Sequence, residues 1–192
     1  RRIVTSAGAS RDSSTMNIRE ELTRLTPSRE SVLSIGVFDG VHRGHRHLFA
    51  NLTAEASRTD RVAGVVTFRN HPASVLKRDF KPLYLTSAED RLGLIKDAGV
   101  DFVVPISFDL DLSKLRARQF AELLQKHLRM RALVVGPDFA MGHQREGDPK
   151  TLALLGREMG FYIHVVSPLA NERGQLIRST AVRDALAQGD VT

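Results

Sequence analysis

The glycine-rich stretch at residues 36–45, Gly-Val-Phe-Asp-Gly-Val-His-Arg-Gly-His, constrains the fold of this chain more than any other feature of the sequence. An apolar run at residues 31–35 precedes it, and an amphipathic segment at residues 46–58 follows it. This order is typical of a β-strand, a tight turn and an α-helix. The stretch therefore predicts a turn that joins a strand to a helix in an α/β fold.

The composition of this turn favours phosphate binding. Its glycines permit close approach of a ligand to the backbone, and they are Gly36, Gly40 and Gly44. A helix that starts near Arg43 would direct free N–H groups and the positive end of its dipole at the turn. His42 and His45 are three residues apart, so they share one face of the first helical turn and can donate to one polyphosphate. The alternative is a pair of surface histidines in a helix cap.

Strand and helix patterns alternate along the rest of the chain. The predicted strands are residues 32–37, 62–68, 102–105, 132–135 and 161–166. The predicted helices are residues 46–58, 87–97, 113–128 or 115–128, 149–159 and 179–187, with a short candidate at 16–25. Residues 73–86 show no period and are expected to be irregular. This alternation predicts a Rossmann-like, doubly wound α/β fold with a five-stranded parallel sheet.

Loops that follow predicted strands are the expected ligand sites, because such folds bind ligands beyond the carboxyl ends of their strands. One of these loops is residues 67–72, Thr-Phe-Arg-Asn-His-Pro. His71 and Pro72 fix an extended turn, and Phe68 offers an aromatic face near the ligand edge. The alternative is that Phe68 belongs to the core and His71 is an ordinary turn residue.

Two further loops carry polar side chains. In residues 136–148, Gly136 permits close approach, Asp138 can accept from a ribose or a base amine, and Arg145 can reach a phosphate. The alternative is an ordinary connection. In residues 177–183, a hydroxyl residue is expected to cap a helix and leave N–H groups for an anion, with nearby arginines adding positive charge. The alternative is a plain capped helix with surface arginines. The hydroxyl residues and arginines of this segment are Ser179, Thr180, Arg178 and Arg183.

The composition limits the function classes. The chain of 192 residues has no cysteine, which excludes disulfides, zinc–thiolate sites and thiol nucleophiles within it. Its formal charge of +6 permits an anionic partner, yet basic and acidic residues are mixed and Trp is absent, so a phosphate-rich small molecule is favoured over nucleic acid. No apolar run approaches the roughly 20 residues of a membrane helix. We expect no membrane partner and a cytoplasmic location.

The domain organisation is expected to be simple. Residues 1–15 are polar and lack a helical or strand period, so they are interpreted as a tail, from a leader or upstream sequence, that activity does not need. Residues 16–192 are expected to form one nucleotidyltransferase domain, the class that the following resemblance indicates.

Taken together, the four loops carry a family resemblance. The H-x-G-H pattern resembles the signature of the HIGH-type nucleotidyltransferases. From about residue 32 to its end, the chain resembles the FMN adenylyltransferase (FAD synthetase) module of bacterial bifunctional riboflavin kinase/FMN adenylyltransferases. The family runs are G-x-F-D-G-x-H-x-G-H, T-F-x-x-H-P, V-G-x-D-F-x-x-G with R-x-G-D, and I-S-S-T-x-[IV]-R, matched at residues 36–45, 67–72, 135–148 and, in part, 177–183.

Two departures from the family are apparent. Arg178 stands where the family usually has the first Ser of I-S-S-T, while Ser179, Thr180 and Arg183 stay in register. The β-barrel riboflavin kinase domain of the family is missing from this sequence, and it is expected to act in cis in a longer chain or in trans.

The resemblance implies that the chain transfers AMP from MgATP to FMN, giving FAD and pyrophosphate. The implied catalytic residues are His42, His45, Ser179, Thr180 and Arg183. The implied ATP-binding residues are Gly36, Val37, Phe38, Asp39, Gly40, His42, Gly44, His45, Gly136, Asp138, Phe139, Ser179, Thr180 and Arg183. The implied flavin-binding residues are Phe68, His71, Pro72 and Phe139. Mg²⁺ would be held mainly through the phosphates, with Asp39 as a candidate partner through water.

Two other functions remain open at this point. One is another small-molecule nucleotidyltransferase, such as a cytidylyltransferase or an adenylyltransferase that makes coenzyme A or NAD. The other is a nucleotide-binding regulator that kept the fold and lost turnover, for which the Arg178 departure is the only indication.

Overall fold

The computed structural model describes residues 18–80, 83–172 and 174–189. Its centre is a five-stranded parallel sheet with the order β3-β2-β1-β4-β5. The strands are β1 Ser31–Gly36, β2 Val62–Phe68, β3 Phe102–Ile106, β4 Met130–Val135 and β5 Tyr162–Val165. The predicted parallel α/β fold is confirmed. After β3 the chain returns to the other side of β1, so the strand order reverses between β1 and β4, which is where such folds bind ligands.

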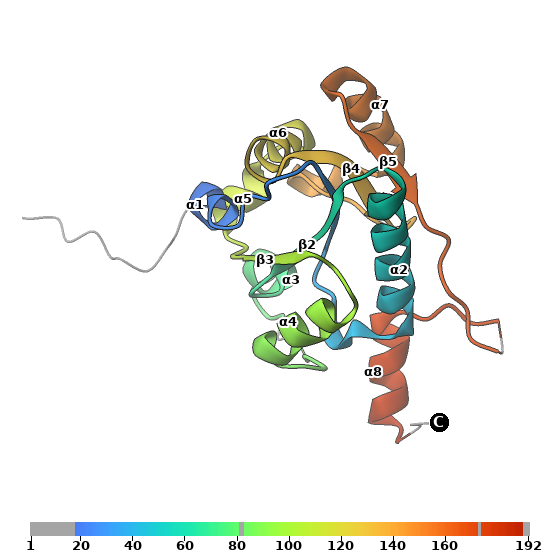
Figure 1. Ribbon diagram of the computed structural model, residues 1–192. Helices are drawn as coiled ribbons and strands as arrows, with labels where there is room; N and C mark the ends of the chain where they lie inside the picture. Colours follow the sequence, from blue (N-terminus) through green and yellow to red (C-terminus); the bar gives the residue numbers. More distant parts are fainter. Residues whose placement is uncertain (1–17, 81–82, 173, 190–192) are drawn as a thin grey trace, which may run out of the picture.

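Helices cover both faces of the sheet, giving three layers. The helices are α1 Ile18–Thr23, α2 Arg43–Arg58, α3 Pro72–Leu76, α4 Ala88–Asp97, α5 Leu110–Lys114, α6 Ala117–Leu128, α7 Pro149–Met159 and α8 Ser179–Ala187. Two 3₁₀ turns, η1 Asp39–Val41 and η2 His143–Arg145, join them. Figure 1 shows α2 and α4 on one side of the sheet, α1, α5 and α6 on the other, and α8 beyond the end of α2.

The central strands are apolar almost throughout because both their faces are covered. In β1, Leu33 and Ile35 point into the core under α1, α5, α6 and α7, whereas Val32 points into the core under α2 and α4. Phe49 and Leu52 of α2 are fully buried against this second face. The amphipathic pattern at residues 46–58 therefore fixes α2 directly behind the glycine-rich turn.

Two helix predictions differ from the structure in part. The helix expected to start at Ser113 or Leu115 and to end at about Leu128 is α6, but it begins at Ala117, where the Gln119 side chain accepts from the Arg116 N–H (2.9 Å). Residues 113–114 belong to a separate helix, α5, which the Asp109 side chain caps by accepting from the Leu112 N–H (2.7 Å). Residues 73–76 are helical, as part of α3, and not irregular. His71 caps that helix by accepting from the Ala73 N–H at 3.1 Å, and Pro72 occupies its first turn.

The short helix expected at residues 16–25 is confirmed as α1 over its described part, and it belongs to the fold. Leu22 is fully buried, and Glu21 is 4% exposed. The Glu21 carboxylate accepts from the Ser107 N–H at 2.7 Å and pairs with Arg69 at 3.4 Å. Residues 1–15, interpreted as a dispensable tail, lie outside the described residues, and the division at residue 16 stays a prediction.

Candidate active site

The turn after β1 is built around a buried phenylalanine. Phe38 adopts a left-handed conformation (φ 52°) and is 5% exposed, with its ring 4.9 Å from that of Phe49. A Cβ on Gly36 would lie 2.9 Å from the Phe38 ring, so this position requires glycine. The Phe38 side chain therefore belongs to the core. Its expected contact with ATP stays a prediction, and it would have to be made by the backbone of this residue.

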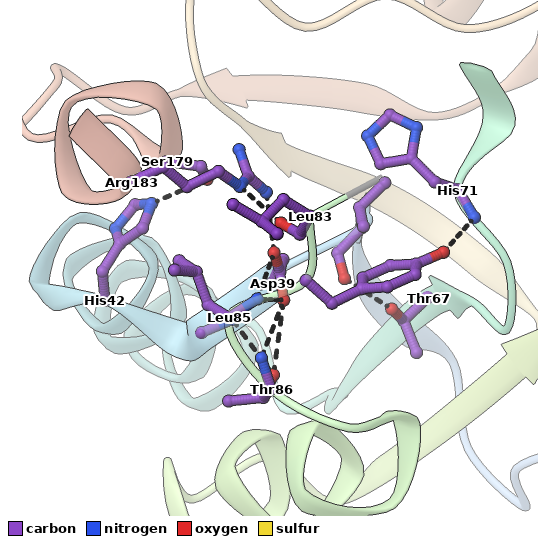
Figure 2. A network of polar contacts seen from close by, with 12 residues as sticks. Asp39, His42, Thr67, His71, Leu83, Leu85, Thr86, Ser179 and Arg183 are labelled. Carbon is purple, nitrogen blue, oxygen red and sulfur yellow. Dashed lines mark hydrogen bonds and ion pairs between the residues drawn. The ribbon is translucent and has the colours of Figure 1, made fainter. Parts of the chain in front are cut away.

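His42 and His45 lie together at the N-terminus of α2, as predicted. Their rings are stacked with centroids 3.7 Å apart. His42 is the N-cap residue, and its Nδ1 accepts from the His45 N–H at 3.4 Å. The proton of a neutral His42 then sits on Nε2, which lies 3.1 Å from Ser179 Oγ at the start of α8. The H-x-G-H run thus contacts a segment more than a hundred residues further along the chain (Figure 2).

Burial keeps both imidazoles neutral. Burial lowers the pKa of His42, and the nearby Arg183 guanidinium lowers it further. Burial and the neighbouring His42 lower the pKa of His45 to about 3, against the opposing effect of Asp39. His45 Nδ1 is buried and has no hydrogen-bond partner. Two neutral imidazoles beside a helix N-terminus can donate N–H groups to an anion without repelling each other.

Asp39 is the centre of a buried network that joins three segments (Figure 2). Its carboxylate is 2% exposed and accepts from the backbone N–H groups of Leu85 (3.0 Å) and Thr86 (3.2 Å) and from Arg183 Nη2 (2.7 Å). Burial alone would raise the pKa of Asp39, but the bonds from Leu85, Arg183 and Thr86 outweigh it and lower the pKa. Arg183 Nε also donates to the Leu83 carbonyl at 2.9 Å. A water-mediated Mg²⁺ contact for Asp39 stays a prediction, and it would compete with these bonds.

The N-terminus of α8 is not capped by the residues that the sequence predicted. Arg178 is the N-cap residue and gives no side-chain cap, and Ser179 is the first helical residue, so neither Ser179 nor Thr180 caps the helix as predicted. Ser179 instead contacts His42, while Thr180 is exposed. The Arg178 guanidinium pairs with the Asp138 carboxylate at 3.1 Å. The start of α8 thereby connects the turn after β1 to the loop after β4.

The loop after β4 leaves space beside its first residue. A Cβ on Gly136 would meet nothing within 4 Å, so a ligand can approach this backbone closely. Asp138 is exposed, and its carbonyl accepts from Arg145 Nη2 at 3.0 Å, which turns Arg145 back onto the loop. Phe139 is half-buried against the core. The Asp138 carboxylate thus lies at the start of α8, whereas the ring of Phe139 packs partly into the core.

Three of the residues expected to bind flavin, Phe68, His71 and Pro72, lie at or directly after the end of β2, whereas the fourth, Phe139, lies in the loop after β4. Phe68 is half-buried, and its ring lies 5.6 Å from that of Phe108 at a steep angle. The His71 N–H donates to the Tyr84 hydroxyl at 2.8 Å, and the His71 ring lies 5.0 Å from Phe80. Burial lowers the pKa of His71, with a further contribution from Arg183. Pro72 follows as the first residue of α3.

Sequence reasoning missed the segment at residues 83–86. It has no regular period, yet its backbone binds Asp39 and Arg183, and Tyr84 contacts His71. The available signal was Thr86-Ser87, a hydroxyl pair directly before a helix. Ser87 caps α4 by accepting from the Asp90 N–H at 3.0 Å.

The sheet order and the turn at residues 36–45 define the class of protein: a Rossmann-like α/β domain with two histidines at a helix N-terminus beside the switch point, a place where backbone N–H groups can bind an anion. A family model described as FAD synthetase matches residues 25–181. The chain belongs to the FAD synthetase family.

Similar proteins from bacteria have names that fit this family. The chain is 40% identical over 166 residues to the bifunctional riboflavin kinase/FMN adenylyltransferase of Escherichia coli (strain K12), a match that covers 86% of this chain and 53% of that protein. It is 31% identical over 165 residues to the protein of the same name from Bacillus subtilis (strain 168), covering 84% of this chain and 51% of that one. The chain therefore spans about half the length of these relatives.

Solved structures show the same fold. A crystal structure of a macrolide-efflux protein from Streptococcus pneumoniae superposes with a TM-score of 0.78 at 25% identity, covering 88% of this chain and 55% of that one. A pantoate–β-alanine ligase from Francisella tularensis superposes with a TM-score of 0.57 at 12% identity, covering 88% of this chain and 72% of that one. The second likeness concerns the fold alone.

The part of the chain that the structure describes holds no membrane-spanning helix and no metal-binding cluster among its residues. No helix among them is both long and apolar enough to cross a membrane. Within the same residues, no group of three or more His, Asp or Glu side chains is arranged to hold a metal ion.

Proposed function

We propose that this chain transfers AMP from MgATP to FMN, giving FAD and pyrophosphate. The observation that carries the proposal is the stacked pair of His42 and His45 at the N-terminus of α2, in contact with Ser179, in a chain of the FAD synthetase family. The names of the relatives from Escherichia coli and Bacillus subtilis include FMN adenylyltransferase and support the same reaction.

The chemistry needs no side-chain base. A phosphate monoester has its second pKa near about 6, so the FMN phosphate is largely dianionic at neutral pH and serves as the nucleophile. One of its oxygens bonds to the α-phosphorus of ATP, and the bond from that phosphorus to the bridging oxygen of pyrophosphate breaks. The protein has to align the two phosphates and stabilise the charge that develops on the leaving group.

His42 and His45 would donate N–H groups to the triphosphate, and the free N–H groups of α2 would add to this stabilisation. Because burial lowers the pKa of both histidines, they meet the substrate as neutral donors. Ser179, Thr180 and Arg183 would contact the β- and γ-phosphates. For Arg183, this contact means exchanging a bond to Asp39 or to the Leu83 carbonyl for one to a phosphate.

The remaining residues are assigned to the adenosine part and the flavin part of FAD. The adenosine and its phosphates would be held by two segments. One is the turn after β1, through the backbone of Gly36, Val37, Phe38 and Gly40 and the close approach that Gly44 permits. The other is the loop after β4, with Gly136, Asp138 and Phe139. The flavin would lie against Phe68, His71 and Pro72, near Phe139. Mg²⁺ would bind mainly through the phosphates and would neutralise part of their charge when bound.

The setting of the reaction is also part of the proposal. The relatives are named as bifunctional proteins with a riboflavin kinase, so we expect such a domain to act with this one, in cis or in trans. The partners would be ATP and FMN, without nucleic acid or membrane, and the location would be the cytoplasm.

One observation favours a second candidate, a nucleotide-binding regulator without turnover. Arg178, which departs from the family pattern, pairs with Asp138 at 3.1 Å and so occupies a residue expected at the ATP site. An assay decides between the two: the chain is incubated with MgATP and each of FMN, phosphopantetheine, nicotinamide mononucleotide and choline phosphate, with pyrophosphatase present. FAD formed with FMN alone supports the proposal. MgATP binding without any product supports the regulator, and a product from another acceptor overturns the flavin assignment.

A further inference from the structure

A cavity of about 290 Å³ lies behind the segment at residues 83–86, on the side of β2 and α4. The cavity is lined by Arg69, Tyr84, Leu85, Thr86, Ser87, Ala88 and Arg91. Two of these residues are arginines, three carry hydroxyl groups, and Ser87 and Ala88 lie at the start of the ten-residue helix α4. A water molecule takes up about 30 Å³ in the liquid, so the cavity has room for a group much larger than one water.

The cavity contains an arginine with unused hydrogen-bonding capacity. Arg91 is 2% exposed, and its Nη2 donates to the Phe68 carbonyl at 2.7 Å. Its Nε is buried without a hydrogen-bond partner, and no ion pair involves Arg91 among the described residues. Its guanidinium carbon lies 5.9 Å from the centre of the Tyr84 ring. Burying a cation without an anion is costly, which points to a negatively charged group that Arg91 is built to receive.

The carboxylates nearest the cavity are bonded to groups other than Arg91. Arg69 pairs with Glu21 on α1, which offsets one charge, and the Ser87 hydroxyl donates to the Asp90 carboxylate at 2.6 Å on the exposed start of α4. Neither carboxylate is bonded to Arg91. The first-turn N–H groups of α4 add their partial positive charge at the same end.

We propose that this cavity is a phosphate subsite, in which Arg91 and Arg69 bind a phosphate group that is either the phosphate of FMN or a free inorganic phosphate or pyrophosphate. Thr86 forms part of the wall between this cavity and the Asp39 network, because its backbone N–H and its hydroxyl both bond to Asp39. A phosphate bound here would lie next to the segment that holds Arg183. The FMN source rests on the proposed function, whereas the free-phosphate source does not.

The test measures binding without ATP and without turnover, so that a failure of the adenylyltransferase proposal does not decide it. Phosphate is also expected to bind at the histidine pair, and all proteins therefore carry His42→Ala. The thermal stability of this parent is measured with increasing inorganic phosphate and pyrophosphate, and the dissociation constants of FMN and riboflavin are measured by flavin fluorescence. Arg91→Lys keeps the positive charge but loses the guanidinium, and Arg69→Ala removes a positive charge. Both are compared with Arg157→Ala, which removes one positive charge from an exposed position on α7.

We expect phosphate to stabilise the parent and the Arg157→Ala control, and to bind about 10-fold or more weakly to Arg91→Lys and Arg69→Ala. Loss of affinity for FMN but not for riboflavin in these two variants identifies the flavin phosphate as the source. Loss of affinity for pyrophosphate with unchanged affinity for FMN identifies a free inorganic anion as the ligand of this cavity. Arg69 is half exposed, so Arg69→Ala keeps the test decisive if Arg91→Lys does not fold. Unchanged phosphate affinity in the folded variants, or equal losses for FMN and riboflavin, would overturn the proposal.

Discussion

Arg183 on α8 donates a hydrogen bond of 2.7 Å to the buried carboxylate of Asp39, in the turn after β1, across 144 residues of sequence. The same carboxylate binds the backbone of Leu85 and Thr86. These bonds hold the phosphate-binding turn, the segment at residues 83–86 and the last described helix in one arrangement. Asp39 therefore has a structural role that can be tested apart from any contact with a nucleotide.

Replacement of Asp39 is predicted to destabilise the fold. Asp39→Ala leaves the Arg183 guanidinium and two backbone N–H groups without their acceptor, and breaking a buried pair in this way costs about 3–5 kcal/mol. Urea denaturation measures the free energy of unfolding. The control is Asp111→Ala, which removes an exposed partner of Lys114 and is expected to cost less than about 1 kcal/mol. Equal losses in the two variants would contradict the structural role of Asp39.

The stability of the protein is predicted to fall as the pH is lowered from about 6.5 toward 3. In the unfolded chain His45 takes up a proton near its ordinary pKa of about 6.5, whereas in the folded protein its pKa is about 3. Between these values the unfolded state binds more protons, so the free energy of unfolding decreases by about 1.4 kcal/mol per pH unit as pH falls. The lowered pKa of His42 acts in the same direction. The free energy of unfolding of His45→Gln, measured by urea denaturation at each pH, should depend less steeply on pH over this range. An unchanged dependence on pH would refute the lowered pKa of His45.

Gly44 is predicted to be intolerant of a side chain because another segment crosses it. A Cβ at this position would lie 3.0 Å from the Ile177 carbonyl oxygen and 3.2 Å from the His42 ring. Gly44→Ala should displace the start of α8 from His42 and weaken MgATP binding, measured by calorimetry. Gly93→Ala is the matched control, because it lies in α4 with nothing within 4 Å and should stabilise the protein by about 0.5–1 kcal/mol. Equal MgATP affinity in both variants would argue against the close approach.

Ser179 is predicted to orient His42. Ser179→Ala removes the hydroxyl that lies 3.1 Å from His42 Nε2, and we expect turnover to fall by roughly 10-fold, the effect of losing about one hydrogen bond. The KM for FMN should stay near its original value, because Ser179 lies on the ATP side of the proposed site. Ser167→Ala, an exposed serine in the connection after β5, serves as the control. A rise in the KM for FMN without loss of turnover would contradict this role.

The sequence was sufficient for the features that depend on local pattern. Apolar runs predicted all five strands, and the glycines with His42 and His45 predicted the turn and the start of α2. The missed features depend on contacts across the fold. The segment at residues 83–86 has no period because its backbone bonds to Asp39 instead of to a neighbouring strand or turn. Ser179 was read as a cap from its position, whereas its hydroxyl is directed to His42, a contact that only the packing of α8 creates.

The most direct test of the account is FAD formation by the chain and by His42→Ala, each incubated with FMN, MgATP and pyrophosphatase and followed by chromatography. Flavin affinity is measured in parallel by fluorescence. We predict that the chain makes FAD, and that His42→Ala lowers turnover by on the order of 10²–10³ while its affinity for FMN is unchanged. A His42→Ala variant with normal turnover, or a folded chain that binds MgATP and FMN but makes no FAD, would contradict the proposed role of the histidine pair.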